Sequence, residues 1–255
     1  MGLLNDKTIL VTGIYRDSSI AYRVAELAIA EGATVIASGY GKRKRVTEAT
    51  LRRLPTPVPV VEFDAREQQH VTQLADKLRQ HTEHLDGIVH CISQSWPQVV
   101  GDHFMTATYE DVSHSLQVSG YSYVSLVQAV LPLLRPNSSV VGCTIDAQVA
   151  WPLYGWAGVA KAMYESENKY LAKHLAPFNV RANLVAAGPY LSFTAREVQG
   201  VDEAVAAWSE RAPLAWNPED ATPIAQTMIA LLSDWFPSTT GDIIHCDGGF
   251  HAIGY

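Results

Sequence analysis

The chain has 255 residues, of which 47% are hydrophobic, and a formal net charge of -7. This length and hydrophobic content suit a single α/β domain with a filled core. The negative charge argues against nucleic acid or an anionic membrane as the main partner, because a polyanion would repel most of the surface. Small molecules and proteins remain as the expected partners.

The cysteines and the N-terminus suggest a cytoplasmic protein. Cys91, Cys143 and Cys246 are far apart and lack CxxC spacing, so neither a disulfide framework nor a metal site is expected. His81 and His84 have metal-like spacing, but no nearby cysteine completes a ligand set, and we interpret them as surface residues. The first residues lack a signal-peptide pattern, and no apolar run reaches the about 18 residues of a membrane span.

Apolar runs typical of strands alternate along the chain with amphipathic stretches typical of helices. The expected strands cover residues 8–12, 34–38, 58–63, 85–91, 139–143, 179–185 and 242–246. The expected helices cover residues 19–31, 44–54, 68–80, 109–134, 154–175 and 223–232, and residues 190–211 interrupt the rhythm. This order predicts an α/β fold: a single doubly wound, Rossmann-type parallel sheet with helices on both faces, formed by residues 1–255 as one domain.

Ligands of such sheets bind beyond the carboxyl ends of the strands, near the point where the strand order reverses. In this chain the residues at those ends are Gly13, Gly39, Asp64, residues 91–93, residues 143–146 and residues 188–190. They define the candidate site.

The turn after the first expected strand joins it to a helix, where free N–H groups and the helix dipole favour a phosphate. Gly13 is the only glycine in this turn, so the GxGxxG fingerprint of dinucleotide-binding folds is missing. The residues alone leave two interpretations open: a phosphate-binding turn, or an ordinary turn capped by Ser18 or Ser19.

Tyr154 and Lys161 are seven positions apart at the start of an expected helix. At 3.6 residues per turn, such positions share one helix face about 10 Å apart along the axis. One bound cofactor could therefore contact both side chains. A lysine beside a tyrosine would also make the local field positive, which suits negative charge on an oxygen atom.

Several motifs resemble the enoyl-acyl-carrier-protein reductases of the short-chain dehydrogenase/reductase superfamily. They are Gly13 with Ser19-Ile20-Ala21 after a long turn, Asp64, Asp86-Gly87 with His90, Ala187-Gly188-Pro189, residues 240–244 and Asp247-Gly248-Gly249. The mycobacterial type of this family is the most similar, through residues 183–189 and 231–235. The resemblance covers nearly the whole chain.

The resemblance implies reduction of the 2,3 double bond of a trans-2-enoyl thioester, carried on acyl carrier protein or CoA, by hydride from NADH or NADPH in fatty acid or related acyl biosynthesis. It further implies a cytoplasmic homotetramer, in which residues 109–134 and 154–175 pair between subunits, and a substrate-binding loop and helix at residues 190–211. Tyr154 would stabilise the thioester oxygen, and Lys161 would bind the nicotinamide ribose. The implied cofactor-binding residues are Gly13, Ile14, Ser19, Ile20, Tyr40, Asp64, Ala65, Ile92, Ser93, Lys161, Gly188, Pro189, Tyr190 and Ser192.

Residues 38–45 bear on the choice of cofactor. They contain four cations and lack the acid that often holds the ribose 2′-hydroxyl of NAD, which favours the 2′-phosphate of NADPH. Tyr40, in contrast, could supply the aromatic contact to adenine that the most similar NADH-dependent enzymes use. Both cofactors are therefore retained.

Some positions depart from the family pattern. Ser93 replaces a glycine or alanine, Ile145 replaces an aromatic residue near the nicotinamide, and residues 94–97 are less apolar than usual. The short segment 190–211 favours a short or medium acyl chain. Alternatives are another short-chain dehydrogenase/reductase acting on a specialised metabolite, or a non-catalytic dinucleotide-binding regulator. A carbonyl or alcohol oxidoreductase would carry a tyrosine four residues before Lys161, where this chain has Ala157.

Overall fold

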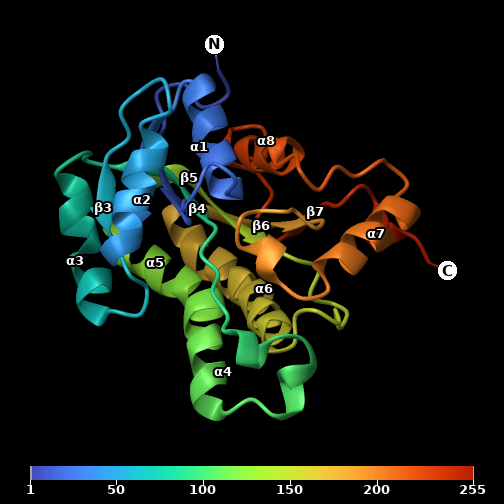
Figure 1. Ribbon diagram of the computed structural model, residues 1–255. Coiled ribbons are helices and arrows are strands. Elements are labelled where there is room, and N and C mark those ends of the chain that lie inside the picture. Colours follow the sequence, from blue (N-terminus) through green and yellow to red (C-terminus); the bar gives the residue numbers. More distant parts are fainter. Residues whose placement is uncertain (1, 255) are drawn as a thin grey trace.

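The computed structural model describes residues 2–254 and contains one seven-stranded, entirely parallel sheet (Figure 1). The strands are β1 (Thr8–Thr12), β2 (Thr34–Gly39), β3 (Val60–Glu62), β4 (Leu85–His90), β5 (Leu134–Thr144), β6 (Arg181–Ala187) and β7 (Ile243–Cys246). Their order in the sheet is β3-β2-β1-β4-β5-β6-β7. The predicted doubly wound α/β fold is confirmed.

Helices cover both faces of the sheet. The α-helices are α1 (Ile20–Ala30), α2 (Gly41–Leu51), α3 (Gln68–Arg79), α4 (Tyr109–Leu116), α5 (Ser122–Val130), α6 (Trp156–Leu175), α7 (Val201–Arg211) and α8 (Thr222–Leu232). One apolar core lies between the sheet and α1, α2 and α8, and a second lies between the sheet and α3, α5 and α6. Short 3₁₀ segments cover Pro97–Val99, Gly101–Met105, Leu131–Leu133, Ala176–Phe178, Ala195–Glu197 and Phe250–Ala252. Among the described residues no helix is long and apolar enough to cross a membrane.

The strand order reverses between β1 and β4, because β2 and β3 lie on one side of β1 and β4 to β7 lie on the other. In such sheets a ligand binds at this point, beyond the carboxyl ends of the strands. Thr12 pairs with His90, and His90 pairs with Gly142 on β5. The next residues along the chain, Gly13, Cys91 and Cys143, therefore meet at one edge of the sheet. That edge carries the candidate site.

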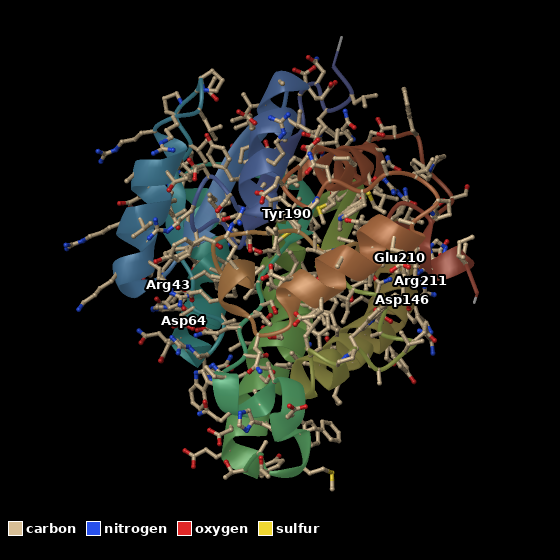
Figure 2. The ribbon with its side chains drawn as sticks, turned by 45° about the vertical axis from the view of Figure 1, so that its right-hand side comes forward. Arg43, Asp64, Asp146, Tyr190, Glu210 and Arg211 are labelled. Carbon is tan, nitrogen blue, oxygen red and sulfur yellow. The ribbon has the colours of Figure 1, made fainter. Side chains whose placement is uncertain are left out.

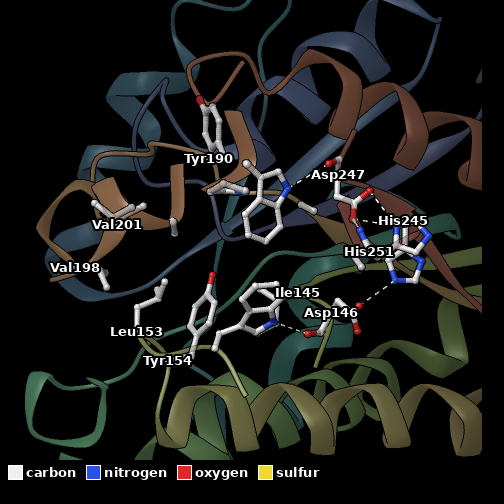
Figure 3. A pocket seen from close by; sticks show the side chains of 17 residues that line it. Ile145, Asp146, Leu153, Tyr154, Tyr190, Val198, Val201, His245, Asp247 and His251 are labelled. Atoms are coloured by element: carbon white, nitrogen blue, oxygen red, sulfur yellow. Dashed lines mark hydrogen bonds and ion pairs between the residues drawn. The ribbon is translucent and has the colours of Figure 1, made fainter. Parts of the chain in front are cut away.

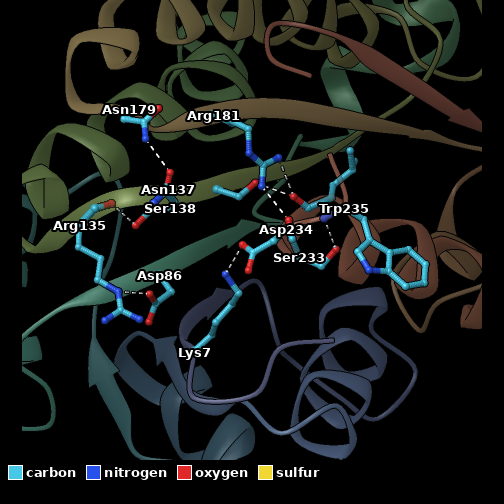
Figure 4. Close-up of polar contacts among 12 residues, drawn as sticks. Lys7, Asp86, Arg135, Asn137, Ser138, Asn179, Arg181, Ser233, Asp234 and Trp235 are labelled. Atoms are coloured by element: carbon cyan, nitrogen blue, oxygen red, sulfur yellow. Dashed lines mark hydrogen bonds and ion pairs between the residues drawn. The ribbon is translucent and has the colours of Figure 1, made fainter. Parts of the chain in front are cut away.

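The amino-terminal edge of the sheet is held by polar contacts between distant parts of the chain (Figure 4). Lys7 Nζ lies 2.8 Å from Asp234 Oδ1, and the guanidinium of Arg135 pairs with Asp86. Arg181 donates to backbone carbonyl oxygens at the end of α8, at 2.9 and 3.0 Å. These contacts stabilise the amino-terminal edge of the sheet, which lies opposite the candidate site at the carboxyl edge.

The single helix predicted for residues 109–134 is wrong. The structure contains α4, a π-helical turn at Gln117–Tyr121, α5 and a 3₁₀ turn that includes Pro132. A β-carbon on Gly120 would lie 3.2 Å from Met163 Sδ and 3.3 Å from the Ala160 carbonyl oxygen, so α6 packs directly against the π turn. The close packing of α6 against Gly120 therefore accounts for the π turn. The spacing of apolar residues in the sequence does not predict this turn.

The predicted start of the next helix is also wrong by two residues. α6 begins at Trp156, and Gly155 before it has a φ of 50°. Tyr154 consequently lies in the turn before the helix, where its N–H donates to the Trp151 carbonyl oxygen at 3.1 Å. The axial spacing expected for Tyr154 and Lys161 on one helix does not apply.

Candidate active site

A cleft of about 370 Å³ runs along the carboxyl edge of the sheet. Figure 2 shows Arg43 and Asp64 together at one end of the molecule, Tyr190 near the middle and Asp146 toward the other side. The cleft is lined by every residue expected to contact the cofactor: Gly13, Ile14, Ser19, Ile20, Tyr40, Asp64, Ala65, Ile92, Ser93, Lys161, Gly188, Pro189, Tyr190 and Ser192. Tyr154 also lines it. The fold thus brings the predicted set together, and contact with a cofactor stays a prediction.

The turn after β1 is built around Gly13. Its φ is 90°, and a β-carbon there would lie 2.3 Å from the Cys91 carbonyl oxygen, so only glycine fits. Ser19 Oγ accepts the N–H groups of Tyr15 and Arg16 at 3.1 and 3.0 Å and donates to the Arg16 carbonyl oxygen. The Ser19 side chain therefore shapes the turn from within.

The start of α1 opens onto the cleft. Ile20 and Ala21 line it, and the first N–H groups of a helix have no partner inside the helix. Ser18 Oγ accepts the N–H of Phe193 at 3.2 Å, which ties this turn to the segment after β6. Capping of α1 by Ser18 or Ser19 is wrong, because neither hydroxyl accepts an N–H group of the helix. The backbone donors at the start of α1 stay available to an anion.

The guanidinium groups of Arg43 and Arg66 lie at the corner between β2 and β3. Arg66 donates to both carboxylate oxygens of Asp64, at 2.9 and 2.6 Å. Burial alone would raise the pKa of Asp64, but these hydrogen bonds lower it overall, so the carboxylate stays charged and is already paired. The guanidinium groups of Arg66 and Arg43 lie 5.3 and 5.7 Å from the ring centre of Tyr40.

Other predicted residues have defined local partners. Ser93 Oγ donates to Ser119 Oγ at 3.2 Å, so the unusual hydroxymethyl group points to the π turn. Gly188 N–H donates to the Cys246 carbonyl oxygen at 3.0 Å, and Trp216 Nε1 donates to the Pro189 carbonyl oxygen at 2.8 Å. These contacts fix the strand ends that border the middle of the cleft.

Lys161 is buried within the first two turns of α6. Its ammonium group donates to the Cys143 carbonyl oxygen at 2.9 Å and lies 4.4 Å from the ring centre of Tyr164. Burial lowers the pKa of Lys161, and nearby Cys143, Cys91 and Glu165 oppose that shift. The lysine thus places a constrained positive charge at the end of β5.

Tyr154 reaches the same cleft from the turn before α6. Desolvation raises the pKa of Tyr154 to about 12, with a smaller contribution from Cys143. The phenol therefore stays protonated at neutral pH and can donate a hydrogen bond. The structure brings Tyr154 and Lys161 to one site although the two side chains come from different local structures.

A second cavity of about 130 Å³ adjoins the cleft (Figure 3). Five residues line both spaces: Ile145, Tyr154, Ala187, Pro189 and Tyr190. Part of the remaining wall comes from the segment predicted to bind substrate, through Ala195, Val198, Val201, Ala204 and Trp208. The mostly apolar space thus begins at the Tyr154 side chain.

Aromatic rings form one wall of this cavity. The rings of Trp151 and Trp208 have centroids 5.1 Å apart, and Trp208 stacks on Phe250 at 3.8 Å. The indole N–H groups donate to the backbone carbonyl oxygens of Asp146 and Asp247 at 2.6 and 3.1 Å. Each indole N–H of this wall is therefore satisfied by a backbone carbonyl oxygen.

The sequence comparisons agree with this geometry. A family model described as enoyl-(acyl carrier protein) reductase matches residues 13–251. The chain belongs to the enoyl-acyl-carrier-protein reductase family. Its similarity to the mycobacterial type is also shown: the chain is 42% identical over 262 residues to the enoyl-[acyl-carrier-protein] reductase [NADH] of Mycolicibacterium smegmatis, covering 97% of both proteins.

More distant members of the enoyl-acyl-carrier-protein reductase family also match nearly end to end. The enoyl-[acyl-carrier-protein] reductase [NADPH] FabI of Staphylococcus aureus is 31% identical over 253 residues, covering 98% of both chains. The enoyl-[acyl-carrier-protein] reductase [NADH] FabI of Escherichia coli is 29% identical, covering 98% of this chain and 96% of its own.

Arg66 lines the cleft although the sequence did not indicate it as a site residue. Arg43, Cys91 and Cys143 also line the cleft, and each lies in a segment expected at the site. Arg66 follows Asp64 by two residues at a strand end, which is a signal for a local ion pair. Within residues 2–254 no group of three or more histidine, cysteine, aspartate or glutamate side chains is arranged to hold a metal ion.

Proposed function

We propose that the protein reduces the 2,3 double bond of a trans-2-enoyl thioester, carried on acyl carrier protein or CoA, with NADH or NADPH as the reductant. The observation that carries this proposal is the position of Tyr154, which lines both the cleft of the buried Lys161 and the apolar cavity. Relatives named enoyl-[acyl-carrier-protein] reductase support the same chemistry.

The cleft fits a dinucleotide. Gly13 allows the turn after β1 to pack against the Cys91 carbonyl oxygen, and the N–H groups at the start of α1, which line the cleft, suit a pyrophosphate. Tyr40 offers a ring face at the corner between β2 and β3, and Lys161 places a cation at the opposite part of the cleft. Ribose hydroxyls of a bound nicotinamide nucleotide would accept hydrogen bonds from the Lys161 ammonium group.

Tyr154 and Lys161 stabilise the negative charge that develops on the substrate. When bound, the reduced dinucleotide would supply a hydride to C3 of the enoyl group. The displaced electron pair of the double bond places negative charge on the thioester oxygen, which Tyr154 O–H stabilises by a hydrogen bond. The Lys161 ammonium group adds a positive field, and a proton from water completes the saturated acyl group at C2.

Both reductants are part of the proposal. The guanidinium of Arg43 lies over Tyr40, which supports binding of the 2′-phosphate of NADPH. The relative from Mycolicibacterium smegmatis is named for NADH, and the one from Staphylococcus aureus for NADPH. We therefore propose NADH or NADPH as the reductant, with Arg43 controlling the preference.

A homotetramer in the cytoplasm is also proposed. Tyr109, Tyr121, Val159 and Tyr170 are exposed apolar or aromatic side chains on α4, the π turn and α6, the segments expected to pair between subunits. Large apolar or aromatic side chains exposed on these segments are consistent with pairing between subunits. The three free cysteines suit a reducing compartment. Light scattering coupled to size-exclusion chromatography tests the tetramer.

The activity is tested by mixing the protein with NADH or NADPH and trans-2-hexenoyl-CoA and following the absorbance of the reduced nicotinamide. We expect turnover of the enoyl thioester and none of the matching β-ketoacyl thioester. Turnover of the β-ketoacyl thioester alone would identify a carbonyl reductase. Dinucleotide binding without turnover of any thioester would identify the regulator instead.

A further inference from the structure

The apolar cavity beside Tyr154 has one polar end, formed by Asp146, His245 and His251. All three residues line the cavity together with Tyr154. Figure 3 shows these three side chains on one side of the cavity, and Leu153, Val198 and Val201 on the other. Hydrocarbon alone would gain nothing from contact with such polar groups, because their hydration would be lost without replacement.

His245 is the least satisfied group of this polar end. Its ring stacks on that of His251 with centroids 3.7 Å apart, and its Nε2 lies 3.6 Å from Asp146 Oδ2, which is too long for a hydrogen bond. Across residues 2–254, neither ring nitrogen of His245 has a hydrogen-bond partner, and its side chain is 27% exposed. Its hydrogen-bonding capacity is therefore available to a ligand.

Asp146 also keeps free capacity. Its Oδ1 accepts the N–H of Gln148 at 3.1 Å, while Oδ2 has only the distant contact to His245. The neighbouring Asp247 differs, because it accepts the N–H groups of Gly249 and His251, at 2.9 Å each, and the His251 ring. Asp247 thus stabilises the turn at residues 247–251. Asp146 and His245, in contrast, keep hydrogen-bonding atoms that a ligand could use.

The cavity limits the size of what could reach this end. Its volume of about 130 Å³ is well below the about 300–1,000 Å³ of pockets for drug-sized ligands. Trp208, whose ring stacks on Phe250, bounds it, and Ile145, next to Asp146, lines it beside Tyr154. A short acyl chain that begins at Tyr154 would therefore place its far end near Asp146 and His245.

We propose that the polar end of this cavity binds a hydrogen-bond donor, a hydroxyl or ammonium group, at the far end of a short acyl chain. The Asp146 carboxylate accepts the donor, and His245 contributes a second hydrogen bond. The natural substrate is then an ω-substituted short enoyl thioester rather than a plain hydrocarbon one. This inference rests on the proposed enoyl reduction.

The test compares three CoA thioesters of one chain length: trans-2-hexenoyl, its ω-hydroxy form and its ω-amino form. We expect kcat/KM to be about tenfold or more higher for at least one substituted thioester than for the plain one, as one extra hydrogen bond to a charged group predicts. A larger gain for the amino form assigns an ammonium ligand, and a larger gain for the hydroxy form assigns a neutral one.

Variants tie the preference to the two side chains. Asp146→Asn keeps an oxygen for Gln148 N–H, and both it and His245→Phe should bring the ratio of substituted to plain kcat/KM close to one. Asp76→Asn on α3 and His81→Phe, which alter exposed residues far from the cavity, serve as matched controls and should keep the wild-type ratio. Thermal unfolding of every variant reports whether it is folded.

The outcomes separate the two proposals. Turnover of plain hexenoyl-CoA with no preference for either substituted form, or a preference that survives both cavity variants, overturns the polar-end inference and leaves the enoyl reductase intact. Failure to reduce any of the three thioesters with either nicotinamide overturns both.

Discussion

The ammonium group of Lys161 is held by the Cys143 carbonyl oxygen at 2.9 Å. This contact connects α6 to the carboxyl end of β5 and constrains the charge of Lys161 within the cleft. The ring of Tyr164, 4.4 Å away, supports the same charge through its π face. Lys161 is thus positioned before any ligand binds, which suits a residue that holds a ribose.

Replacement of Lys161 by alanine should weaken cofactor binding. The variant loses the cation and hydrogen-bond donor in the cleft, and we expect the dissociation constant for NADH to rise about tenfold or more. Fluorescence titration measures it. Lys169→Ala, an exposed position on the same helix, is the control and should bind like the wild type. An unchanged dissociation constant for the Lys161 variant would contradict the assigned role.

Replacement of Tyr154 by phenylalanine should affect chemistry and leave cofactor affinity unchanged. The variant keeps the ring and loses the donor to the developing oxyanion, so kcat should fall about 100-fold. Tyr170→Phe, an exposed tyrosine on α6, is the matched control. Steady-state kinetics and NADH titration on both variants separate the two effects. Full activity of Tyr154→Phe would show that another group stabilises the oxyanion.

The alkaline limb of the pH profile should report Lys161 rather than Tyr154. Burial lowers the pKa of Lys161 below its usual value, whereas burial raises the pKa of Tyr154 to about 12. The lysine therefore loses its proton first as pH rises, and kcat/KM should fall at a pH below that of an ordinary lysine. Lys161→Arg, which keeps its charge, should move this fall to higher pH. A limb that stays in place in the arginine variant would point to a different group.

Arg43 should govern the choice between NADPH and NADH. Loss of its guanidinium removes a partner for the 2′-phosphate, so Arg43→Ala should lower kcat/KM with NADPH about tenfold or more and change that with NADH little. Arg52→Ala, an exposed cation after α2, is the control. Equal losses with both dinucleotides would mean that Arg43 acts on the fold and not on the phosphate.

His90 should make the fold sensitive to acid. Burial, with the charge of Lys161, lowers the pKa of His90 to about 3, and its ring nitrogens contact Tyr164 and Ser122 hydroxyls at 2.9 Å each. In the unfolded chain His90 binds a proton below about pH 6.5, whereas in the folded protein it stays neutral down to about pH 3. The free energy of unfolding therefore falls as the pH drops from about 6.5 toward 3.

Chemical denaturation at pH about 7 and about 4.5 measures this loss, which should be about 2–3 kcal/mol larger for the wild type than for His90→Gln. Glu167, whose pKa burial raises to about 7, acts in the opposite direction but is present in both proteins and cancels in the comparison. The same acid loss in both proteins would contradict the assignment to His90.

The sequence predicts the sheet well because its strands are buried on both faces and form continuous apolar runs, such as Thr8–Thr12, which matches β1 residue for residue. It predicts the π turn and the start of α6 poorly, because tertiary packing at Gly120 and the positive φ of Gly155 override the helical period. The position of Tyr154 in a turn follows from the positive φ of Gly155, after which α6 begins.

The residues of the candidate site divide in the same way. Gly13, Asp64 and Lys161 can be recognised because strand ends and motif spacing mark them. The pairing of Asp64 with Arg66 and the stacking of His245 on His251 depend on side-chain conformations, which spacing along the chain does not encode. The polar end of the cavity could therefore be found only in three dimensions.

Hydride delivery from the nicotinamide to the β-carbon of the enoyl group can be followed by isotope transfer. The protein is supplied with nicotinamide dinucleotide carrying deuterium at the transferring position and with trans-2-hexenoyl-CoA, and the product is analysed by NMR. We predict deuterium at C3 and a solvent-derived proton at C2 of hexanoyl-CoA. An unchanged enoyl thioester, or deuterium at any other carbon, would show that the protein does not deliver hydride to the β-carbon.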